Sequence, residues 1–230
     1  MDFLILIFLL IITIILIRVV YQINIKEIKQ IAENNKELDD IVKSYPSNIE
    51  ICKSILKKLN NEKVKIQEDK KANNCLYIAV SDKIIIANMR ESFTRIQTIA
   101  HECLHSVQDR RILLFNYIFS CFYLACFYIL VLLGIVRVLP NKILILNVFI
   151  ILGFIYYFVR SYLEDDAMIK ARFLAKEYME ESNISNKTEI GKIINEYDNL
   201  NYLGIKATNF SLFLSTIIRV FILCVVFIIR

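Results

Sequence analysis

The sequence contains few of the residues that interrupt regular structure. Its 230 residues include only 4 Gly and 2 Pro, which excludes collagen-like chains and disordered chains rich in Gly and Pro. Trp is absent, and there are only 2 His. Hydrophobic residues, in contrast, make up 57% of the chain, above the roughly 45–50% of an average soluble domain. Since 22% of the residues are still charged, we expect a membrane protein with a small water-exposed portion.

The 6 Cys do not follow the spacing of a secreted disulfide framework. Cys121, Cys126 and Cys224 lie in long apolar runs, and only Cys52 and Cys75 lie in ordinary soluble sequence. We therefore expect buried, reduced thiols. The sequence contains no Cys-x-x-Cys pair, which argues against a zinc ribbon.

Four apolar segments are long enough to cross a bilayer, which takes about 20 residues. They cover residues 3–21, 113–139, 143–160 and 209–229. Pro140-Asn141-Lys142 predicts a tight turn between the second and third segments. Because the chain starts with Met1-Asp2 and no Ala-x-Ala-like site follows, we interpret the first segment as an uncleaved anchor.

Lys and Arg are concentrated in residues 26–111 and 160–206. The positive-inside rule therefore places both stretches in the cytoplasm and both termini outside. The net charge of +5 follows from this topology, and no nucleic-acid-binding motif accompanies it. Arg219 lies near the middle of the last segment, where a charge is costly. It indicates either a buried ion pair or polar cavity, or a side chain that snorkels to the membrane surface.

The water-exposed stretches predict alternating helices and strands. Helical spacing covers residues 23–45, and a second helix follows Pro46 with Ser47 as N-cap. Residues 63–67 alternate like a strand. Two strands at 75–80 and 83–88 are expected to form a hairpin, and a third helix is expected at 92–110. A further helix is expected to leave the third span over 160–179. A loop at 182–188 and a last helix at 189–202 follow.

The third of these helices carries the sequence His101-Glu102-Cys103-Leu104-His105. This is a His-Glu-x-x-His motif, in which residues i and i+4 share one helix face, so that two imidazoles can bind one zinc ion. The Glu can act as general base on water at the metal. Both His of the chain belong to the motif. This makes it improbable that the motif arose by chance. The opposite face is an apolar stripe formed by Ile96, Ile99, Ala100, Cys103, Leu104 and Val107.

Catalytic zinc usually has three protein ligands, and no third His exists. Glu164 is the best candidate, because it lies where the third span ends on the predicted side of the motif. Asp165 and Asp166 compete for this role. Ala167, Ala171 and Ala175 share the helix face of Glu164 and would let another helix approach closely. The alternative interpretation of the acidic triplet is a solvated helix segment.

The residues Ile99 to Gln108 resemble the motif of the bacterial membrane-embedded neutral zinc metallopeptidases of the YugP type. A second match is Glu164-Asp165-Asp166-Ala167, which is similar to the Glu-x-Asp-Ala block that follows a transmembrane hairpin in that family. The resemblance implies a zinc-dependent endopeptidase with His101, His105 and Glu164 as ligands and Glu102 as base. The family usually has Gly where this chain has Leu104. Membrane prenyl-protein endopeptidases share the helix motif but have Asp at the position of Met168.

The sequence thus predicts a mainly α membrane protein with about four transmembrane helices and a small cytoplasmic α+β zincin-like metallopeptidase domain. The expected parts are an N-terminal anchor over residues 1–21 and a cytoplasmic α+β part with the motif over residues 22–112. A transmembrane hairpin over residues 113–163 comes next. Cytoplasmic helices with the third ligand follow over residues 164–208, and a last transmembrane helix covers residues 209–230. The expected cofactor is Zn²⁺, and the expected partners are the bilayer and a peptide or membrane-protein substrate. The expected location is the cell membrane, with the site on the cytoplasmic side.

Further expectations concern the reaction. Arg172, Tyr162 and Tyr178 are candidates for a second oxyanion donor. The strand at 83–88 is expected to form a sheet edge to which an extended substrate could add. Two alternatives remain open, namely a non-catalytic metal-binding signalling or scaffold protein, and a structural membrane protein in which the motif arose by chance.

Overall fold

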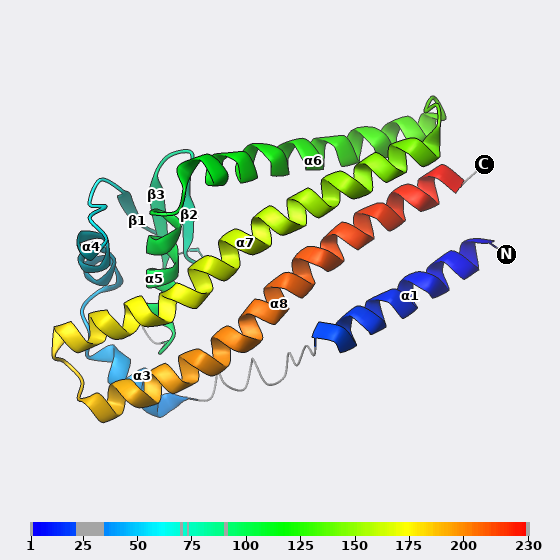
Figure 1. Cartoon of the computed structure of the whole chain (residues 1–230). Helices are drawn as coiled ribbons and strands as arrows, with labels where there is room; N and C mark the ends of the chain where they lie inside the picture. The colour runs from blue at the N-terminus through cyan, green and yellow to red at the C-terminus, as the bar shows by residue number, and fades with distance from the viewer. Residues whose placement is uncertain (1, 22–34, 70, 73, 90–91, 229–230) are drawn as a thin grey trace. The chain divides into compact units, whose positions relative to one another are not determined.

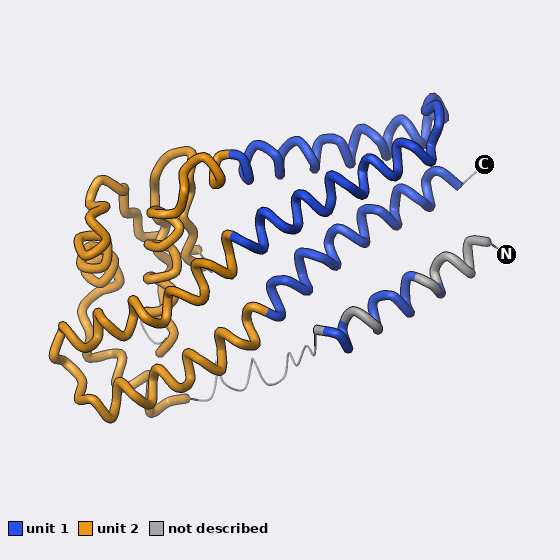
Figure 2. Tube along the Cα trace, viewed as in Figure 1, with its two compact units in different colours: residues 1–23, 115–162, 206–230 blue, residues 24–114, 163–205 orange. Residues whose placement is uncertain are grey.

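A computed structural model describes residues 2–21, 35–69, 71–72, 74–89 and 92–228. The described chain is mainly helical and contains one small sheet (Figure 1). It divides into two compact units, shown in different colours in Figure 2. Unit 1 comprises residues 1–23, 115–162 and 206–230, and unit 2 comprises residues 24–114 and 163–205.

Unit 1 is built from four helices or parts of helices, namely α1 (Asp2–Tyr21), α6 (Arg110–Val136), α7 (Lys142–Ser182) and α8 (Lys187–Ile228). Three of them, α6, α7 and α8, are long and apolar enough to cross a membrane. The expected first span lies in α1, where the described apolar helix Leu10–Val20 is shorter than a full span. The fourth span therefore remains a prediction.

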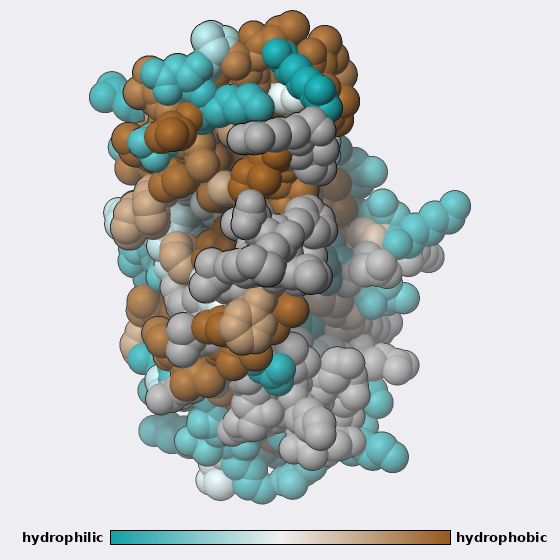
Figure 3. All heavy atoms as spheres, turned by 90° about the vertical axis from the view of Figure 1, so that its right-hand side faces the viewer, coloured by the Kyte–Doolittle hydropathy of each residue, from teal (hydrophilic) through white to brown (hydrophobic). Residues whose placement is uncertain are grey.

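The apolar side chains of unit 1 lie largely on its outside. Ile118 is 64% exposed and Leu132 61% exposed, and hydrophobic side chains are visible on the surface in Figure 3. An aromatic cluster forms the interior, with Tyr123, Phe127, Phe149, Tyr156 and Leu223 buried. This distribution suits helices whose solvent is lipid.

The predicted turn between α6 and α7 is confirmed. Asn141 adopts a positive φ of 40°, which Asn tolerates better than most residues, and its Oδ1 accepts a hydrogen bond from the Leu144 N–H at 3.2 Å. The helix predicted to continue through Met179 is also confirmed, because α7 ends at Ser182. The last expected helix and the last span form one helix, α8.

Unit 2 contains the short helices and the strands. They are α3 (Lys36–Lys43), α4 (Asn48–Lys58), β1 (Lys65–Asp69), β2 (Leu76–Ile78), β3 (Lys83–Ala87) and α5 (Arg95–His105). The helix expected over residues 23–45 is confirmed where α3 lies, and its first part, 23–34, is outside the described residues. Ser47 is the predicted N-cap of α4, and it forms a reciprocal capping box with Glu50.

The sheet has the order β1-β3-β2. β1 runs parallel to β3 with Lys65 opposite Lys83, and β2 pairs antiparallel with Tyr77 opposite Ile84, which confirms the hairpin. The expectation that β3 forms an edge was wrong. β3 is the most apolar strand and buries Ile84 and Ile86 completely, so it takes the central position and leaves β1 and β2 at the edges.

Helix α5 is shorter than the predicted 92–110, because residues 106–109 turn before α6 begins. Its predicted apolar stripe is buried from Ile96 to Leu104. Val107 is the exception and is 43% exposed, since it follows the end of the helix. The stripe packs in one core with α3, α4, the sheet and the first part of α8.

Arg95 at the start of α5 is completely buried. Its Nη1 donates to the Pro46 carbonyl at 3.0 Å and to Asn48 Oδ1 at 2.8 Å. Its Nη2 donates to the carbonyls of Val42 and Tyr45 at 2.8 and 2.9 Å. The guanidinium thus satisfies carbonyls in the last turn of α3 and just after it, where the helix dipole favours a cation, and it connects the motif helix to α3 and α4.

Candidate metal centre

Three of the predicted site residues converge in unit 2. His101 and His105 project from one face of α5, and their Nε2 atoms lie 3.0 Å apart. Glu164 on α7 places its Oε2 3.6 Å from Nε2 of His101 and 3.7 Å from Nε2 of His105. All three ligand atoms lie within 4.8 Å of one another. The structure therefore brings together one group of side chains that could hold a metal ion.

The separations suit a small cation. Donors about 2.1 Å from one zinc ion in tetrahedral geometry lie about 3.4 Å from one another. The three observed separations lie on either side of this value. Two imidazoles and one carboxylate are also a donor set that zinc accepts in catalytic sites. The residues present thus fit the metal that the sequence predicts, whereas the identity of the ion is not fixed by these contacts.

Glu102 is 7% exposed and is oriented by the sheet. Its Oε2 accepts a 2.6 Å hydrogen bond from the backbone N–H of Tyr77 in the edge strand β2. The Tyr77 hydroxyl donates in turn to Asp82 Oδ1 at 2.9 Å. The edge strand therefore fixes the position of the carboxylate that follows the first His.

Gln108 orients the second His. Its Oε1 lies 2.8 Å from Nδ1 of His105, so that Nδ1–H can donate to it while Nε2 faces Glu164. The Gln108 Nε2 donates to the Leu163 carbonyl at 2.8 Å and to Asp166 Oδ2 at 3.1 Å. One side chain thus contacts both a candidate ligand and the helix turn that carries Glu164, in the manner of outer-shell partners that orient metal-binding His.

The electrostatics of the site favour an ionised Glu164. Burial alone would raise the pKa of this carboxyl, but the interaction with His101 and His105 outweighs burial and holds the pKa well below its usual range. For His105, burial lowers the pKa, and the contacts with Glu164 and Gln108 more than reverse that effect. Burial raises the pKa of Glu102, against the opposing influence of the two His.

The acidic triplet separates into different roles. Only Glu164 belongs to the ligand group found in the described part of the chain. Asp166 instead forms an ion pair with Lys170 at 2.5 Å and accepts from Gln108. The small residues on the same helix, Ala167, Ala171 and Ala175, are completely buried in the core that also contains the apolar face of α5.

Two of the three candidate oxyanion donors are engaged elsewhere. Arg172 pairs with Asp198 and lies over the Phe173 ring. Tyr178 packs against Tyr45, with ring centroids 6.2 Å apart. Tyr162 belongs to unit 1. None of them is brought to the three ligands by a contact within unit 2.

All 6 Cys are free, as expected, but only Cys52, Cys75 and Cys103 are buried. Cys121 is exposed on α6, so the expectation of burial was wrong for this thiol. Cys103 is completely buried on the apolar face of α5, with its Sγ 3.7 Å from that of Cys52. It therefore packs in the core rather than facing the ligand group, as the helical periodicity predicts.

Sequence reasoning missed the supporting contacts of Tyr77 and Gln108. Gln108 was within reach, because the helix predicted over 92–110 would place it three residues after His105 on the same face. The pairing of Tyr77 with Glu102 spans 25 positions, and no periodic pattern reports a contact of that kind.

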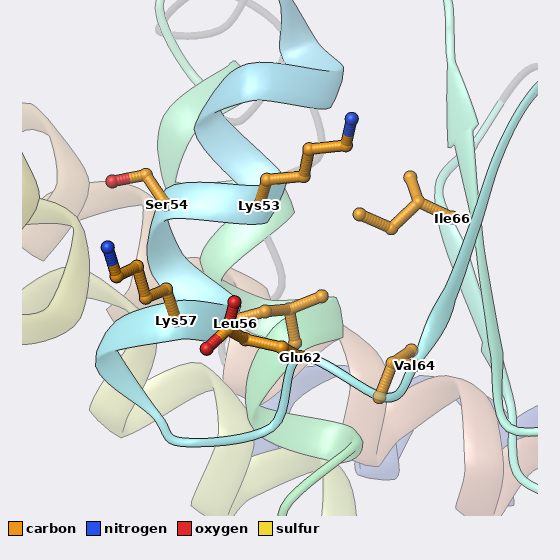
Figure 4. A pocket seen from close by; sticks show the side chains of 7 residues that line it. All are labelled: Lys53, Ser54, Leu56, Lys57, Glu62, Val64 and Ile66. Atoms are coloured by element: carbon orange, nitrogen blue, oxygen red, sulfur yellow. The ribbon is translucent and has the colours of Figure 1, made fainter.

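A separate cavity lies between α4 and β1 (Figure 4). Its volume is about 550 Å³, and Lys53 and Ile66 line opposite walls. None of the three candidate ligands lines it. The cavity is thus distinct from the candidate metal centre.

Comparisons with protein-family models, curated proteins and solved structures find no match to this chain.

Proposed function

We propose that this chain is a membrane-embedded, zinc-dependent endopeptidase that hydrolyses peptide bonds at the cytoplasmic membrane face. The observation that carries the proposal is the convergence of His101, His105 and Glu164 beside Glu102. These residues come from a motif helix and from a second helix distant in sequence. Three apolar helices support a membrane location, and the Lys/Arg distribution supports the orientation.

A bound zinc ion would supply Lewis-acid activation of water and of the peptide carbonyl. The chain itself supplies the proton transfers. Glu102 takes a proton from the attacking water and later delivers it to the leaving amine. The Tyr77 N–H holds one oxygen of this carboxylate, and Gln108 holds the His105 ring, so both side chains start from fixed positions.

The edge strand β2 supports an extended peptide as substrate. β3 is paired on both sides, so it cannot accept a further strand. Among the described strands, β2 pairs with β3 alone, and its Tyr77 N–H already donates to Glu102. Tyr77 of β2 contacts Glu102 directly. A peptide that adds to β2 by backbone hydrogen bonds would run beside the general base.

The motif likeness described above gives this proposal its family. The resemblance to the YugP-type metallopeptidases rests on residues 99–108 and 164–167 and on the order of elements. The contact of Gln108 with His105 supports this likeness, because the Gln is part of the shared motif. Membership of that family is part of the proposal.

Metal content is the first measurement. Purified wild-type protein, dialysed against metal-free buffer, should retain about one zinc ion per chain in elemental analysis. Glu164→Ala and His105→Ala should lose it, and Glu102→Gln should keep it. The exposed Glu180 of the same helix, which pairs with Lys176, provides the control Glu180→Gln. Wild-type protein without metal would support the structural alternative.

Peptide cleavage is the second measurement. A mixed library of quenched fluorescent peptides should be cleaved by the zinc-loaded protein in detergent. Glu102→Gln should reduce the rate about 10²–10⁴-fold, the range that a general base contributes. Metal without cleavage would favour the scaffold alternative. Undiminished cleavage by the Glu102→Gln variant would remove Glu102 from its role.

A further inference from the structure

The two edges of the sheet have different surroundings. At one edge, the Tyr77 N–H of β2 donates to Glu102 beside the candidate metal centre. At the other edge, β1 forms one wall of the cavity of about 550 Å³ whose opposite wall is α4 (Figure 4). This volume lies within the roughly 300–1,000 Å³ of typical ligand sites. The cavity lies wholly in unit 2 and is a second place where a ligand could bind.

The strand β1 offers unpaired backbone groups beside this cavity. Among the described strands it pairs with β3 alone, and its Lys65 N–H donates to the Asp82 carbonyl at 3.0 Å. Because the backbone groups of successive residues in a strand point in opposite directions, those of Ile66 and Glu68 point away from β3. In the described part of the chain, no hydrogen bond outside the sheet involves them. This edge can therefore accept a further strand.

The cavity combines an apolar floor with a cationic rim. Its floor contains Leu56 and Val64, which are 1% and 5% exposed, and the partly buried Ile66. Its rim contains Lys53 and Lys57, which are exposed and lie one turn apart on α4. Figure 4 shows the Lys53 side chain extending toward the opposite wall. A ligand can thus bury an apolar group on the floor and place a charged group at the rim.

The two lysines of the rim form no ion pair within the described part of the chain. Lys58, the next residue of α4, shows the contrast, because it pairs with Glu177 at 2.9 Å and with Glu181 at 2.6 Å. The chain therefore neutralises the lysine that faces its own helix α7 and leaves those that face the cavity without a carboxylate.

Nearby acidic groups do not cancel this charge. Glu50, the only carboxylate of α4, is engaged in the capping box with Ser47. Glu62 lines the cavity and is exposed. Two lysines and one glutamate leave a net charge of +1 among the lining residues. Charge complementarity thus favours an acidic ligand.

We propose that this cavity and the free edge of β1 bind an extended acidic peptide of a partner protein. The peptide adds as a further strand, and its backbone bonds to Ile66 and Glu68. Side chains alternate along a strand, so two residues separated by one face α4. An apolar residue contacts Leu56 and Val64, and an acidic residue contacts Lys53. The recognised pattern is thus apolar-x-acidic, and its recognition is independent of whether the chain hydrolyses peptides.

The test measures binding of short fluorescent peptides to the full-length protein in phosphatidylcholine nanodiscs by fluorescence anisotropy. Peptides with a Val-Thr-Asp core between Thr-rich flanks, which favour strands, are compared with Val-Thr-Asn peptides. We expect the Asp peptide to bind about three- to fivefold more tightly, which is the effect of an exposed ion pair. Absence of binding at about 1 mM peptide, or equal binding of the two peptides, would overturn the proposal.

Methylation of the peptide backbone separates strand addition from charge attraction. Methyl groups on alternate nitrogens remove the N–H groups on one edge of the peptide and leave its side chains unchanged. Only one of the two methylation patterns blocks the edge that faces β1. That pattern should weaken binding at least about tenfold, and the other should change it less than about twofold. Equal binding of both methylated peptides would mean that no strand forms, and would overturn the proposal.

Variants of the chain locate the site. Lys53→Gln with Lys57→Gln should remove the preference for Asp. Lys36→Gln with Lys187→Gln changes two exposed lysines outside the cavity lining and should keep that preference. Glu68→Pro removes an N–H of the free edge, a change that edge strands tolerate, and should abolish binding, whereas Glu68→Gln should not weaken it. Wild-type behaviour of the first double variant or of Glu68→Pro would refute the assignment.

Two further measurements separate this site from other occupants and places. Glu102→Gln should bind the peptide as the wild type does, because Glu102 does not line the cavity. Loss of binding in this variant would place the peptide at the candidate metal centre and overturn the proposal. Sedimentation in detergent reports whether a second copy occupies the edge. A dimer that Glu68→Pro dissociates would overturn the choice of a partner protein.

Discussion

Two arginines show how differently the two units treat a buried charge. In unit 2, Arg95 is completely buried and donates four hydrogen bonds to protein oxygens. In unit 1, Arg219 faces two tyrosine rings, and its Nη1 has no acceptor among the described residues. The first is held by oxygens of its own unit. The second is held between the aromatic faces of neighbouring helices.

The apolar residues show the same contrast. Ile51 and Ile55 in unit 2 are completely buried, whereas Ile118 in unit 1 is 64% exposed. A high content of Ile and Leu therefore means a water-excluding core in one unit and, in the other, an apolar surface of the kind that suits lipid. Three predictions test this contrast, and the largest expected effect concerns Arg95.

Replacing Arg95 by Met should destabilise unit 2 by at least about 3 kcal/mol. The change leaves the carbonyls of Val42 and Tyr45 buried without this donor, and each costs about 1–3 kcal/mol. Hydrogen exchange of the amides of α3–α5 in detergent micelles measures the effect. Lys43→Met removes an exposed charge paired with Asp40 and serves as the control. A difference below about 0.5 kcal/mol between the variants would show that Arg95 is not part of the core.

Truncating one isoleucine in each unit should give unequal effects. Ile55→Ala creates a cavity in the core of unit 2 and should cost about 2–5 kcal/mol. Ile118→Ala removes a side chain that contacts lipid or detergent and should change stability by less than about 0.5 kcal/mol. Denaturant unfolding in the same micelles compares the two. Equal losses would mean that Ile118 is covered, and would contradict the lipid-facing assignment.

Adding one methyl group at two glycines should have effects of opposite sign. Gly153→Ala in unit 1 would overlap the Tyr123 hydroxyl and Thr216 and should cost about 1–3 kcal/mol. Gly191→Ala in unit 2 meets nothing within 4 Å and should stabilise α8 by about 0.5–1 kcal/mol. Thermal unfolding followed by circular dichroism measures both. Stabilisation by Gly153→Ala would show that α6, α7 and α8 pack less closely than described.

The features that were predictable from the sequence are local ones. The capping box of Ser47 and Glu50, the hairpin around Asp82 and the α6–α7 turn depend on residues a few positions apart. The pairing of His101 with His105 follows from helical periodicity, and Glu164 was chosen because it follows a span. All of these patterns except the one for Glu164 have a fixed spacing that the sequence displays directly.

The features that were not predictable depend on distant pairs. The strand order required β1 to pair beyond the hairpin with β3, and no sequence period encodes that choice. The contacts of Arg95 span 47 to 53 positions, and the contact of Tyr77 with Glu102 spans 25. The residues alone gave no sign of these contacts.

The position of Glu164 has a consequence for chain topology. His105 and Glu164 are separated by 59 positions, and the intervening chain includes all of α6 and the first half of α7. A cation shared by the two residues would close this segment into a loop, as a crosslink does, and would reduce the conformational entropy of the unfolded chain. A bound ion would thus crosslink the two ends of the segment that contains the α6–α7 hairpin. Removal of the ion by a chelator would release this constraint without breaking a covalent bond.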